Sequence, residues 1–503
     1  MLFNSFQYLC VFLPIVVAIY WTLVRTRRVT ASILWLGAAS YVFYISGEKL
    51  YPWMLATSVV MNYAIGLAIP RLQGGRATAM MALGVALNLS LLGFYKYASF
   101  LSTQLHSAGL ATPVLDIVLP IGISFFTFTQ IAYLVDVRQG KAREKDFASY
   151  LLFVSYFPHL IAGPILHHSE MLPQFRNPVV KDVARTMASG LLIFAIGLAK
   201  KTLLADPSGA IATNIFGDAA ASPPGFFVAW LGALAYSMQI YFDFSGYSDM
   251  AIGASQMLGI KLPINFNSPY KAISIIDFWR RWHITLSRFL RDYLYIPLGG
   301  NRKGTARRYA NLLTTMVLGG IWHGAGWMFI IWGAMHGIAQ ALAHGWNDLA
   351  KTVKLPKVPP LLGWAATFTF VTIAWVPFRS GSFDQLAHMW RGMFGMGGFA
   401  MIGVGPLRTL GETLGLGVAE VSFNAFGLPA LAVGFFVAVL APNSQQLLRG
   451  FNVGLDSHGY GAHGAPTRFA AQLNWRWIAF TALLLGLAAR AIGGYSEFIY
   501  FQF

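Results

Sequence analysis

The sequence predicts an all-α protein that crosses a membrane many times. Of its 503 residues, 56% are hydrophobic and 11% are charged, whereas a soluble globular domain has roughly 25% charged residues. Apolar stretches recur along the whole chain, and many approach the roughly 20 residues that a helix needs to cross a hydrocarbon core. These two observations predict a single transmembrane domain over residues 1–503, with no separate soluble domain.

The first apolar run, residues 7–24, has no Lys or Arg before it and is followed by a basic segment at 25–28. A cleavable signal peptide begins with a basic region, so this run is expected to stay in the chain as the first span. Because basic residues favour the cytoplasmic side of a membrane, the segment 25–28 predicts an N-terminus outside the cytoplasm. Basic loops at 71–76 and 138–145 agree with this orientation.

The later apolar runs bring the total to about ten to thirteen transmembrane or re-entrant helices, because a long run can form one tilted helix or two shorter ones. These runs are residues 31–45, 51–69, 77–94, 115–135, 147–165, 183–204, 224–242, 312–343, 361–378, 426–440 and 477–492. No internal repeat at a fixed period is visible among them. The chain therefore lacks the symmetry between halves that many transporters show.

Residues 275–295 have a different pattern, in which apolar side chains recur at steps of three or four and Asp and Arg fill the other side. This period predicts an amphipathic helix that lies at the membrane surface or caps the bundle. The surrounding segment 271–308 is rich in Lys and Arg. It is therefore expected to face the cytoplasm.

The net charge of +17 is carried largely by short loops between apolar runs. The orientation rule and anionic lipid headgroups account for this distribution, so membrane lipid is the expected partner and nucleic acid is not. The single cysteine, Cys10, cannot form an intrachain disulfide. Its place in an apolar run predicts a packing role.

His323 is the outstanding candidate for chemistry. It lies within residues 319–327, Gly-Gly-Ile-Trp-His-Gly-Ala-Gly-Trp, beside a long apolar run. An ionisable residue in such a place usually faces a bundle interior or an aqueous cavity, and the glycines allow close approach to the imidazole. A neutral imidazole is the form that a general base needs to take a proton from a hydroxyl. Taken alone, the position slightly favours a hydrogen-bonded structural histidine over a catalytic one.

Three further polar residues accompany apolar segments. His283 borders the apolar side of the predicted amphipathic helix, so its ring can point into the bundle while neighbouring arginines stay with the headgroups. Asp243 and Asp249 flank Gly246 at the end of an apolar run. Each aspartate can orient an imidazole, bind a hydroxyl or cap a helix end at a chain break, and the sequence leaves these roles open.

No metal site is predicted. His336 follows His323 by thirteen positions, so the two rings would lie on different faces of one continuous helix. His167 and His168 adjoin a loop with Glu170, but adjacent side chains diverge and do not make a good ligand pair.

Four segments together resemble the membrane-bound O-acyltransferase (MBOAT) family. They are 242–249 (Phe-Asp-Phe-Ser-Gly-Tyr-Ser-Asp), 265–270 (Asn-Phe-Asn-Ser-Pro-Tyr), 277–283 (Asp-Phe-Trp-Arg-Arg-Trp-His) and 322–324 (Trp-His-Gly). Their order and spacing match as well, and the resemblance extends over nearly the whole chain, including residues 1–5, 377–383 and 498–503. Within the family the chain is most similar to the membrane subunit of bacterial alginate O-acetyltransferase and its relatives acting on cellulose or peptidoglycan.

The resemblance implies an MBOAT fold, a ring of helices around a thin centre with a tunnel for donor and acceptor. The family's catalytic histidine falls on His323 and the second histidine on His283. Beside them, Asp243 and Trp322 are predicted as supporting or substrate-binding residues. The implied acetyl donor is acetyl-CoA, directly or through a carrier, and no cofactor is expected to stay bound. The implied location is a bacterial inner membrane with a periplasmic N-terminus, and the implied partners are periplasmic acetyltransferase or polysaccharide-modification proteins.

The basic segment offers a place for an anionic donor to dock. Arg288, Arg291, Arg302 and Lys303 are candidates, since an arginine can bind phosphate oxygens through two hydrogen bonds. The orientation rule alone also places basic residues on this side, so the two explanations stay open.

The sequence thus predicts an O-acetyltransferase that moves acetyl groups toward a cell-surface polysaccharide such as alginate. Two alternatives remain: a D-alanyl transfer subunit for teichoic acid, which shares the Trp-His-Gly and Arg-Trp-His features, and a transporter of acyl donor or polymer without chemistry of its own.

Overall fold

The computed structural model describes residues 1–503 apart from 179–180, 420, 422–425, 457–468, 494–497 and 500–503. Nearly all regular structure in the described part is helical, and the two strands β1 (Met401–Ile402) and β2 (Val418–Ala419) form one short parallel pair. The predicted all-α fold is confirmed. The resemblance to the family included residues 498–503. Of these, residues 500–503 lie outside the described residues.

Helices follow one another along the whole described chain. They are α1 (Leu13–Arg25), α2 (Val29–Gly47), α3 (Pro52–Ala68), α4 (Gly74–Ser107), α5 (Ile123–Arg138), α6 (Phe147–Ser155), α7 (Phe157–Leu160), α8 (His168–Arg176), α9 (Val183–Ala199), α10 (Asp206–Asp218), α11 (Phe226–Met257), α12 (Ile275–Arg281), α13 (Ile284–Leu290), α14 (Thr305–His323), α15 (Trp327–Val353), α16 (Pro360–Arg379), α17 (Phe383–Met393), α18 (Gly405–Thr413), α19 (Gly427–Val439), α20 (Ser444–Leu447) and α21 (Trp475–Arg490). Short π-helical segments occur at Tyr8–Phe12, Lys200–Ala205 and Arg291–Tyr295, and 3₁₀ turns at Ile69–Arg71, Pro269–Lys271 and Arg449–Phe451.

Within the described residues, six helical segments are long and apolar enough to cross a membrane. They are Tyr8–Arg25, Val29–Gly47, Pro52–Arg71, Gly74–Ser107, Val183–Asp218 and Pro360–Arg379. Other expected spans form shorter helices. The apolar run 147–165 is split into α6 and α7 just before Pro158, whose ring cannot continue a helix from the preceding turn.

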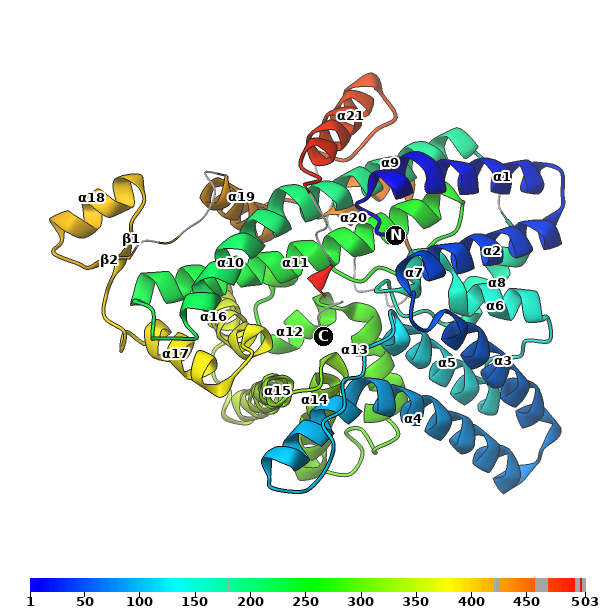
Figure 1. Cartoon of the computed structure of the whole chain (residues 1–503), viewed down its shortest axis with the longest axis horizontal. Coiled ribbons are helices and arrows are strands. Elements are labelled where there is room, and N and C mark those ends of the chain that lie inside the picture. The colour runs from blue at the N-terminus through cyan, green and yellow to red at the C-terminus, as the bar shows by residue number, and fades with distance from the viewer. Residues whose placement is uncertain (179–180, 420, 422–425, 457–468, 494–497, 500–503) are drawn as a thin grey trace.

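Helix α11 forms the central axis of the molecule, with α9 and α10 beside it and α14 and α15 across the bundle (Figure 1). Glycines permit the close contact of α9 with α11, because a Cβ added at Gly197 would lie 2.6 Å from the carbonyl of Gly246. Small residues commonly bring membrane helices together in this way. Gly246 is therefore a packing position inside a continuous helix, which excludes one of the roles left open for Asp243 and Asp249, that of caps at a chain break.

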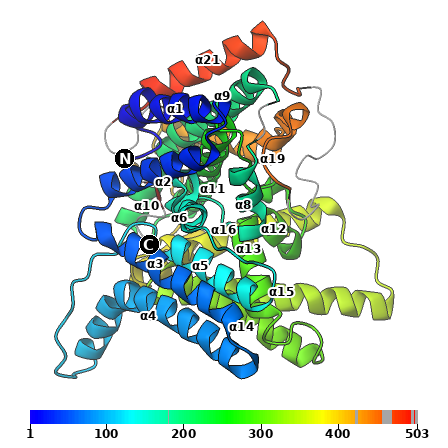
Figure 2. The same cartoon turned by 90° about the vertical axis from the view of Figure 1, so that its right-hand side faces the viewer.

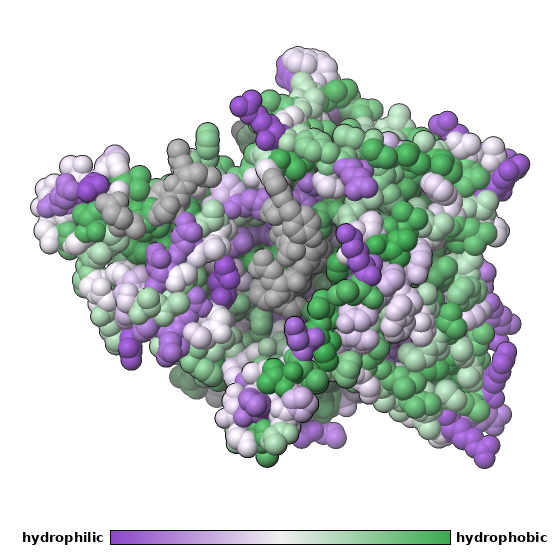
Figure 3. Space-filling view, viewed as in Figure 1, coloured by the Kyte–Doolittle hydropathy of each residue, from purple (hydrophilic) through white to green (hydrophobic). Residues whose placement is uncertain are grey.

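Helices α14 and α15 form an antiparallel pair at the opposite end of the molecule from α21, which packs on α9 (Figure 2). Large apolar side chains on the outer helices α1 to α4 are exposed, as expected for a surface in contact with lipid. Examples are Ile15, Leu34, Val60 and Leu89, each about half exposed. Figure 3 shows apolar residues spread over much of one face of the molecule.

The segment 275–295 does not form one helix. Helix α12 ends at Arg281, His283 adopts a left-handed conformation with φ of 43°, and α13 begins at Ile284. The apolar side of this broken segment packs into the protein, since Trp279 and Trp282 are buried. The segment thus turns into the bundle, and the break places His283 at the head of α13.

Candidate active site

His323 is the last residue of α14, at the point where the chain reverses into α15. Gly324 and Gly326 are extended and α15 begins at Trp327, so the expected apolar run 312–343 is broken at this turn. A side chain at Gly324 would overlap the ring of Phe329. The glycine therefore lets the chain reverse closely enough to hold His323 at the tip of a helical hairpin.

Two further glycines bring the arms of this hairpin together. A side chain at Gly320 would overlap the carbonyl of Phe329, and one at Gly333 would overlap the carbonyl of Met316. Arg308 and Asp348 form an ion pair at the other end of the hairpin. The pair fixes the start of α14 and the end of α15 on the same face of the molecule, away from His323.

Aromatic rings surround His323. Its ring centroid lies 5.0 Å from those of Trp322 and Trp332 and 5.2 Å from that of Phe378. Only 4% of His323 is exposed. The imidazole is thus enclosed by aromatic rings and almost fully shielded from solvent.

His283 is fully buried, and its tautomer follows from its neighbours. The Oδ1 atom of Asn265 accepts from the backbone N–H of Thr285 at 3.3 Å, which identifies it as the amide oxygen. The ring Nδ1 of His283 lies 3.1 Å from the same oxygen and must donate to it. The hydrogen on Nδ1 leaves Nε2 as the nitrogen that carries the lone pair in the neutral ring.

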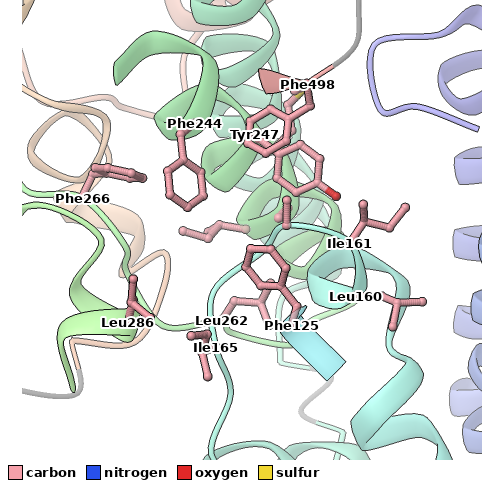
Figure 4. Packing of buried hydrophobic residues seen from close by; sticks show 14 of the residues in the cluster. Phe125, Leu160, Ile161, Ile165, Phe244, Tyr247, Leu262, Phe266, Leu286 and Phe498 are labelled. Atoms are coloured by element: carbon pink, nitrogen blue, oxygen red, sulfur yellow. The ribbon is translucent and has the colours of Figure 1, made fainter. Parts of the chain in front are cut away.

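The imidazole rings of His283 and His323 both lie close to the indole ring of Trp322. The Trp322 ring centroid lies 6.3 Å from that of His283 and 5.0 Å from that of His323. On the other side of His283, the ring of Phe244 packs at 4.7 Å. Figure 4 shows Phe244 among the buried aromatic residues of this region, near Phe266 and Tyr247.

His336 also belongs to this cluster, contrary to the expectation from helical spacing. The rings of His323 and His336 lie 5.0 Å and 4.8 Å from the ring of Trp332. The expected separation assumed a continuous helix, whereas the chain reverses at residues 324–326. His336 accepts a hydrogen bond from Trp279 Nε1 at 3.2 Å. No group of three or more metal-type ligands occurs among the residues that the structure describes.

Asp243 lies inside α11 and has partners other than the imidazoles. Its carboxylate forms a 2.6 Å ion pair with Lys201 and accepts from the backbone N–H of Ile499 at 2.8 Å. Asp249, two turns further along, pairs with Lys200 at 2.6 Å. These ion pairs join α11 to the π-helical segment between α9 and α10, so both aspartates contribute to the packing of the bundle.

Two of the three predicted arginines meet at one cavity. Arg288 and Arg291, together with Arg280 and His344, line a cavity of about 300 Å³ between α12–α13 and α14–α15. Arg288 pairs with Glu170 at 2.5 Å, and Arg291 with Asp292 at 2.7 Å. Arg302 is exposed in the turn before α14 and does not line this cavity. His167 and His168 diverge as expected, toward Asp136 and Glu144 respectively.

The sequence interpretation missed Lys96 and Tyr97 of α4. The Lys96 amine donates to the carbonyls of Trp322 at 2.5 Å and His323 at 2.9 Å, and the Tyr97 hydroxyl donates to the carbonyl of Ile321 at 2.7 Å. The expected apolar run 77–94 ends two positions before Lys96. A lysine within the 34-residue α4 was itself a signal, because ionisable residues inside spans tend to be functional.

Comparison with known proteins gives a consistent picture. The model of the membrane-bound O-acyltransferase family matches residues 71–378, which include His283 and His323. The chain is 43% identical over 430 residues to the peptidoglycan O-acetyltransferase of Helicobacter pylori, covering 80% of this chain and 81% of that relative. It is 37% identical over 520 residues to the probable alginate O-acetylase AlgI of Pseudomonas putida, covering 100% of both chains.

A more distant relative is the teichoic acid D-alanyltransferase of Streptococcus thermophilus, 29% identical over 289 residues that cover 53% of this chain and 69% of that one. The family match covers more than half of the chain, and the first two relatives share more than a third of their aligned residues with it. The chain therefore belongs to the membrane-bound O-acyltransferase family and is a multi-pass membrane O-acyltransferase.

Proposed function

We propose that the protein transfers acetyl groups from a cytoplasmic donor toward a cell-surface polysaccharide, with His323 as the general base. The observation that carries this proposal is the position of His323, buried at the tip of a glycine-rich hairpin and walled by aromatic rings. The names of the relatives with the most extensive similarity, peptidoglycan O-acetyltransferase and probable alginate O-acetylase, support acetyl as the transferred group.

The reaction is a transfer of acetyl from sulfur to oxygen. His323 takes the proton of an acceptor hydroxyl while its oxygen attacks the carbonyl carbon of the acetyl thioester. The tetrahedral intermediate collapses as the carbon–sulfur bond breaks, and the imidazolium returns the proton to the leaving thiolate. The products are an acetyl ester and a free thiol. His283 orients the acceptor, with its tautomer fixed by Asn265.

The proposed donor is acetyl-CoA, directly or through a carrier. The cavity beside α12 and α13 supports this choice, because Arg280, Arg288 and Arg291 line it together. A guanidinium can bind phosphate oxygens through paired hydrogen bonds. Arg288 and Arg291 each have a carboxylate neighbour, whereas no ion pair of Arg280 occurs among the described residues, so Arg280 is the foremost phosphate-binding candidate.

The proposed setting is a bacterial inner membrane, with the N-terminus in the periplasm and the start of α14 at the cytoplasmic face. The basic residues around α12 to α14 support this orientation. A donor would then enter near Arg280, and the acceptor would reach His323 from the other side. The immediate acceptor is expected to be a periplasmic acetyltransferase or another polysaccharide-modification protein.

The experiment is acetyl transfer by the purified protein in lipid bilayers, with acetyl-CoA labelled in the acetyl group and an oligosaccharide or partner protein supplied as acceptor. The proposal predicts a labelled ester and an equal amount of free thiol with the wild type, and neither with His323→Ala. Movement of label without ester formation would instead identify a transporter.

The similarity to the teichoic acid D-alanyltransferase favours one second candidate, transfer of D-alanine. The shared region covers only 53% of this chain, whereas the alginate-type relative from Pseudomonas putida matches 100% of it. Mild base treatment of the modified product separates the two, because it releases acetate in one case and D-alanine in the other.

A further inference from the structure

Lys96 is a charged residue in an unfavourable place. It lies within α4, an apolar segment long enough to cross a membrane, and only 8% of it is exposed. None of the ion pairs in the described part of the chain includes it. A cation inside a span costs several kcal/mol unless it is compensated, and such residues commonly mark a functional site.

The compensation comes from the end of α14. The last carbonyls of a helix have no partner within the helix and carry partial negative charge. At this helix end the chain turns away at Gly324 in an extended conformation. Lys96 donates to the carbonyls of Trp322 and His323, and Tyr97 donates to that of Ile321. Helix α4 thus supplies the C-terminal cap of α14.

We infer that Lys96, with Tyr97, is a positioning residue that holds the backbone of His323 in its reacting geometry. An ammonium group has three donors and no acceptor, so one side chain can hold two adjacent carbonyls on either side of the imidazole-bearing Cα. A methionine at this position would keep the volume and lose both bonds. This inference rests on the proposed role of His323.

The test compares Lys96→Met, Tyr97→Phe and the matched control Lys141→Met, which alters an exposed lysine in the loop after α5. Each protein is purified into lipid bilayers and assayed with labelled acetyl-CoA. Lys96→Met is expected to lower kcat on the order of 10²-fold, the typical effect of misplacing a catalytic group by about 1 Å, with KM for acetyl-CoA changed less than about twofold. Tyr97→Phe is expected to lower kcat about fivefold, as for one lost hydrogen bond.

A chemical rescue separates the amine from general packing. Cys10 is the only cysteine, so Lys96→Cys in a Cys10→Ser background can be alkylated with 2-bromoethylamine to rebuild a lysine-like amine. Alkylation is expected to restore most of kcat, whereas a neutral methylthiol label of the same cysteine is not.

Either of two results would overturn the inference. One is a kcat of Lys96→Met within twofold of the wild type, and the other is equal recovery of kcat in Lys96→Cys by the amine label and the neutral methylthiol label. If Lys96→Met does not accumulate in the membrane, an unchanged kcat in Tyr97→Phe would overturn it as well. An active His323→Ala protein would refute the proposed function itself. Loss of activity in His323→Ala with full activity in Lys96→Met would refute only the role of Lys96.

A second inference comes from an independent feature, the groove between α15 and α16. It has a volume of about 850 Å³, and its walls include Leu342, Trp346 and Phe370. Lys351, Lys354 and Lys357 also line it, and no acidic residue does so within the described structure. Lys351 lies in the last turn of α15, and Lys354 and Lys357 follow the end of this helix, near the Arg308–Asp348 ion pair.

We propose that this groove binds a phospholipid with an anionic headgroup. An acyl chain fits the apolar walls, and the headgroup phosphate meets the lysines, the arrangement found in basic pockets between membrane helices. Native mass spectrometry of protein taken from bilayers of equal phosphatidylglycerol and phosphatidylcholine gives the test. The wild type is expected to retain phosphatidylglycerol preferentially.

Replacement of Lys351, Lys354 and Lys357 by Gln is expected to reduce that preference at least tenfold, because the headgroup phosphate loses three neighbouring positive charges. Lys141→Gln with Lys181→Gln serves as the control for lost charge elsewhere. Equal retention of both lipids by the wild type, or an unchanged preference in the triple variant, would contradict this site.

Discussion

The amine of Lys96 lies 2.9 Å from the carbonyl of His323, although 227 positions separate the two residues in the chain. Helix α4, in the first quarter of the sequence and long and apolar enough to cross a membrane, thus holds the backbone of the candidate catalytic residue in the second half. The proposed chemistry depends on contacts between distant helices as well as on the Trp-His-Gly segment.

Gly324→Ala is expected to reduce acetylation at least tenfold. The added methyl group would overlap the ring of Phe329, and overpacking of this kind costs about 1–3 kcal/mol and displaces neighbouring atoms. Gly326→Ala is the matched control, because its methyl group would lie 3.7 Å from the same ring, in ordinary contact. The measurement is ester formed per amount of protein in the membrane, and equal activity of the two variants would contradict the close-packed turn.

Asn265→Ala is expected to lower both stability and activity. The Oδ1 atom of Asn265 accepts from His283 Nδ1, the Thr285 backbone N–H and the Thr285 hydroxyl. Removing the oxygen leaves buried donors unpaired, at a cost of about 1–3 kcal/mol. Asn265→Asp keeps the acceptor and is expected to retain more activity than Asn265→Ala. Ser248→Ala, which loses only a 3.4 Å contact with Asn265, is the control. Identical kcat values for Asn265→Ala and the wild type would contradict a role of Asn265 in orienting His283.

Asp243 is expected to act on stability through Lys201. Asp243→Asn leaves Lys201 buried beside its remaining partner Asp206, and loss of one member of a buried pair costs about 3–5 kcal/mol. Reversal of the pair, Asp243→Lys with Lys201→Asp, or its joint replacement by Leu and Met, is expected to recover part of the loss. The measurement is the midpoint of thermal unfolding in detergent. Full stability of Asp243→Asn with lost activity would return Asp243 to a catalytic role.

Glu144, in the loop between α5 and α6, predicts a dependence of stability on pH. Burial raises the pKa of this carboxyl, but the nearby imidazole of His168, the backbone N–H of Asp146 and the charge of Arg176 together lower the pKa below its usual value of 4.5. The carboxylate therefore contributes stability above pH 4.5, and this contribution is lost as the pH falls through the lower, folded-state pKa.

Glu144→Gln is accordingly expected to be less stable than the wild type at pH 6, with the difference shrinking toward pH 3. Thermal midpoints between pH 3 and 7 provide the comparison. A difference that stays constant over this range would show that ionisation of Glu144 does not contribute.

Short contiguous segments allowed much of the site to be predicted. His323, Trp322 and His283 lie in motifs whose order resembled the family, and the structure brings all three together. A lysine inside an apolar helix is a signal of function, but the role of Lys96 could not be predicted from it, since its partners are backbone carbonyls far along the chain, and residue type does not identify them.

The breaks in helices were harder to predict than the helices. The spacing of apolar residues in 275–295 shows which side of the segment is apolar, and that side is buried in the structure. The same spacing does not indicate the left-handed conformation at His283. Gly246 is the opposite case, because a glycine between two aspartates left a chain break open as one alternative, whereas the glycine allows two helices to approach closely. At both His283 and Gly246, contacts with distant helices decide whether the helix continues, and the local sequence pattern does not contain those contacts.

The most direct test of the central claim is the O-acetyl content of surface polysaccharide from cells that make the wild type, His323→Ala or no protein, at equal membrane abundance of the two forms. If His323 is the general base, acetate is expected with the wild type and only background acetate with both His323→Ala and the empty strain. Wild-type acetate in the His323→Ala strain would contradict His323 as the general base, and equal acetate in all three strains would contradict acetyl transfer itself.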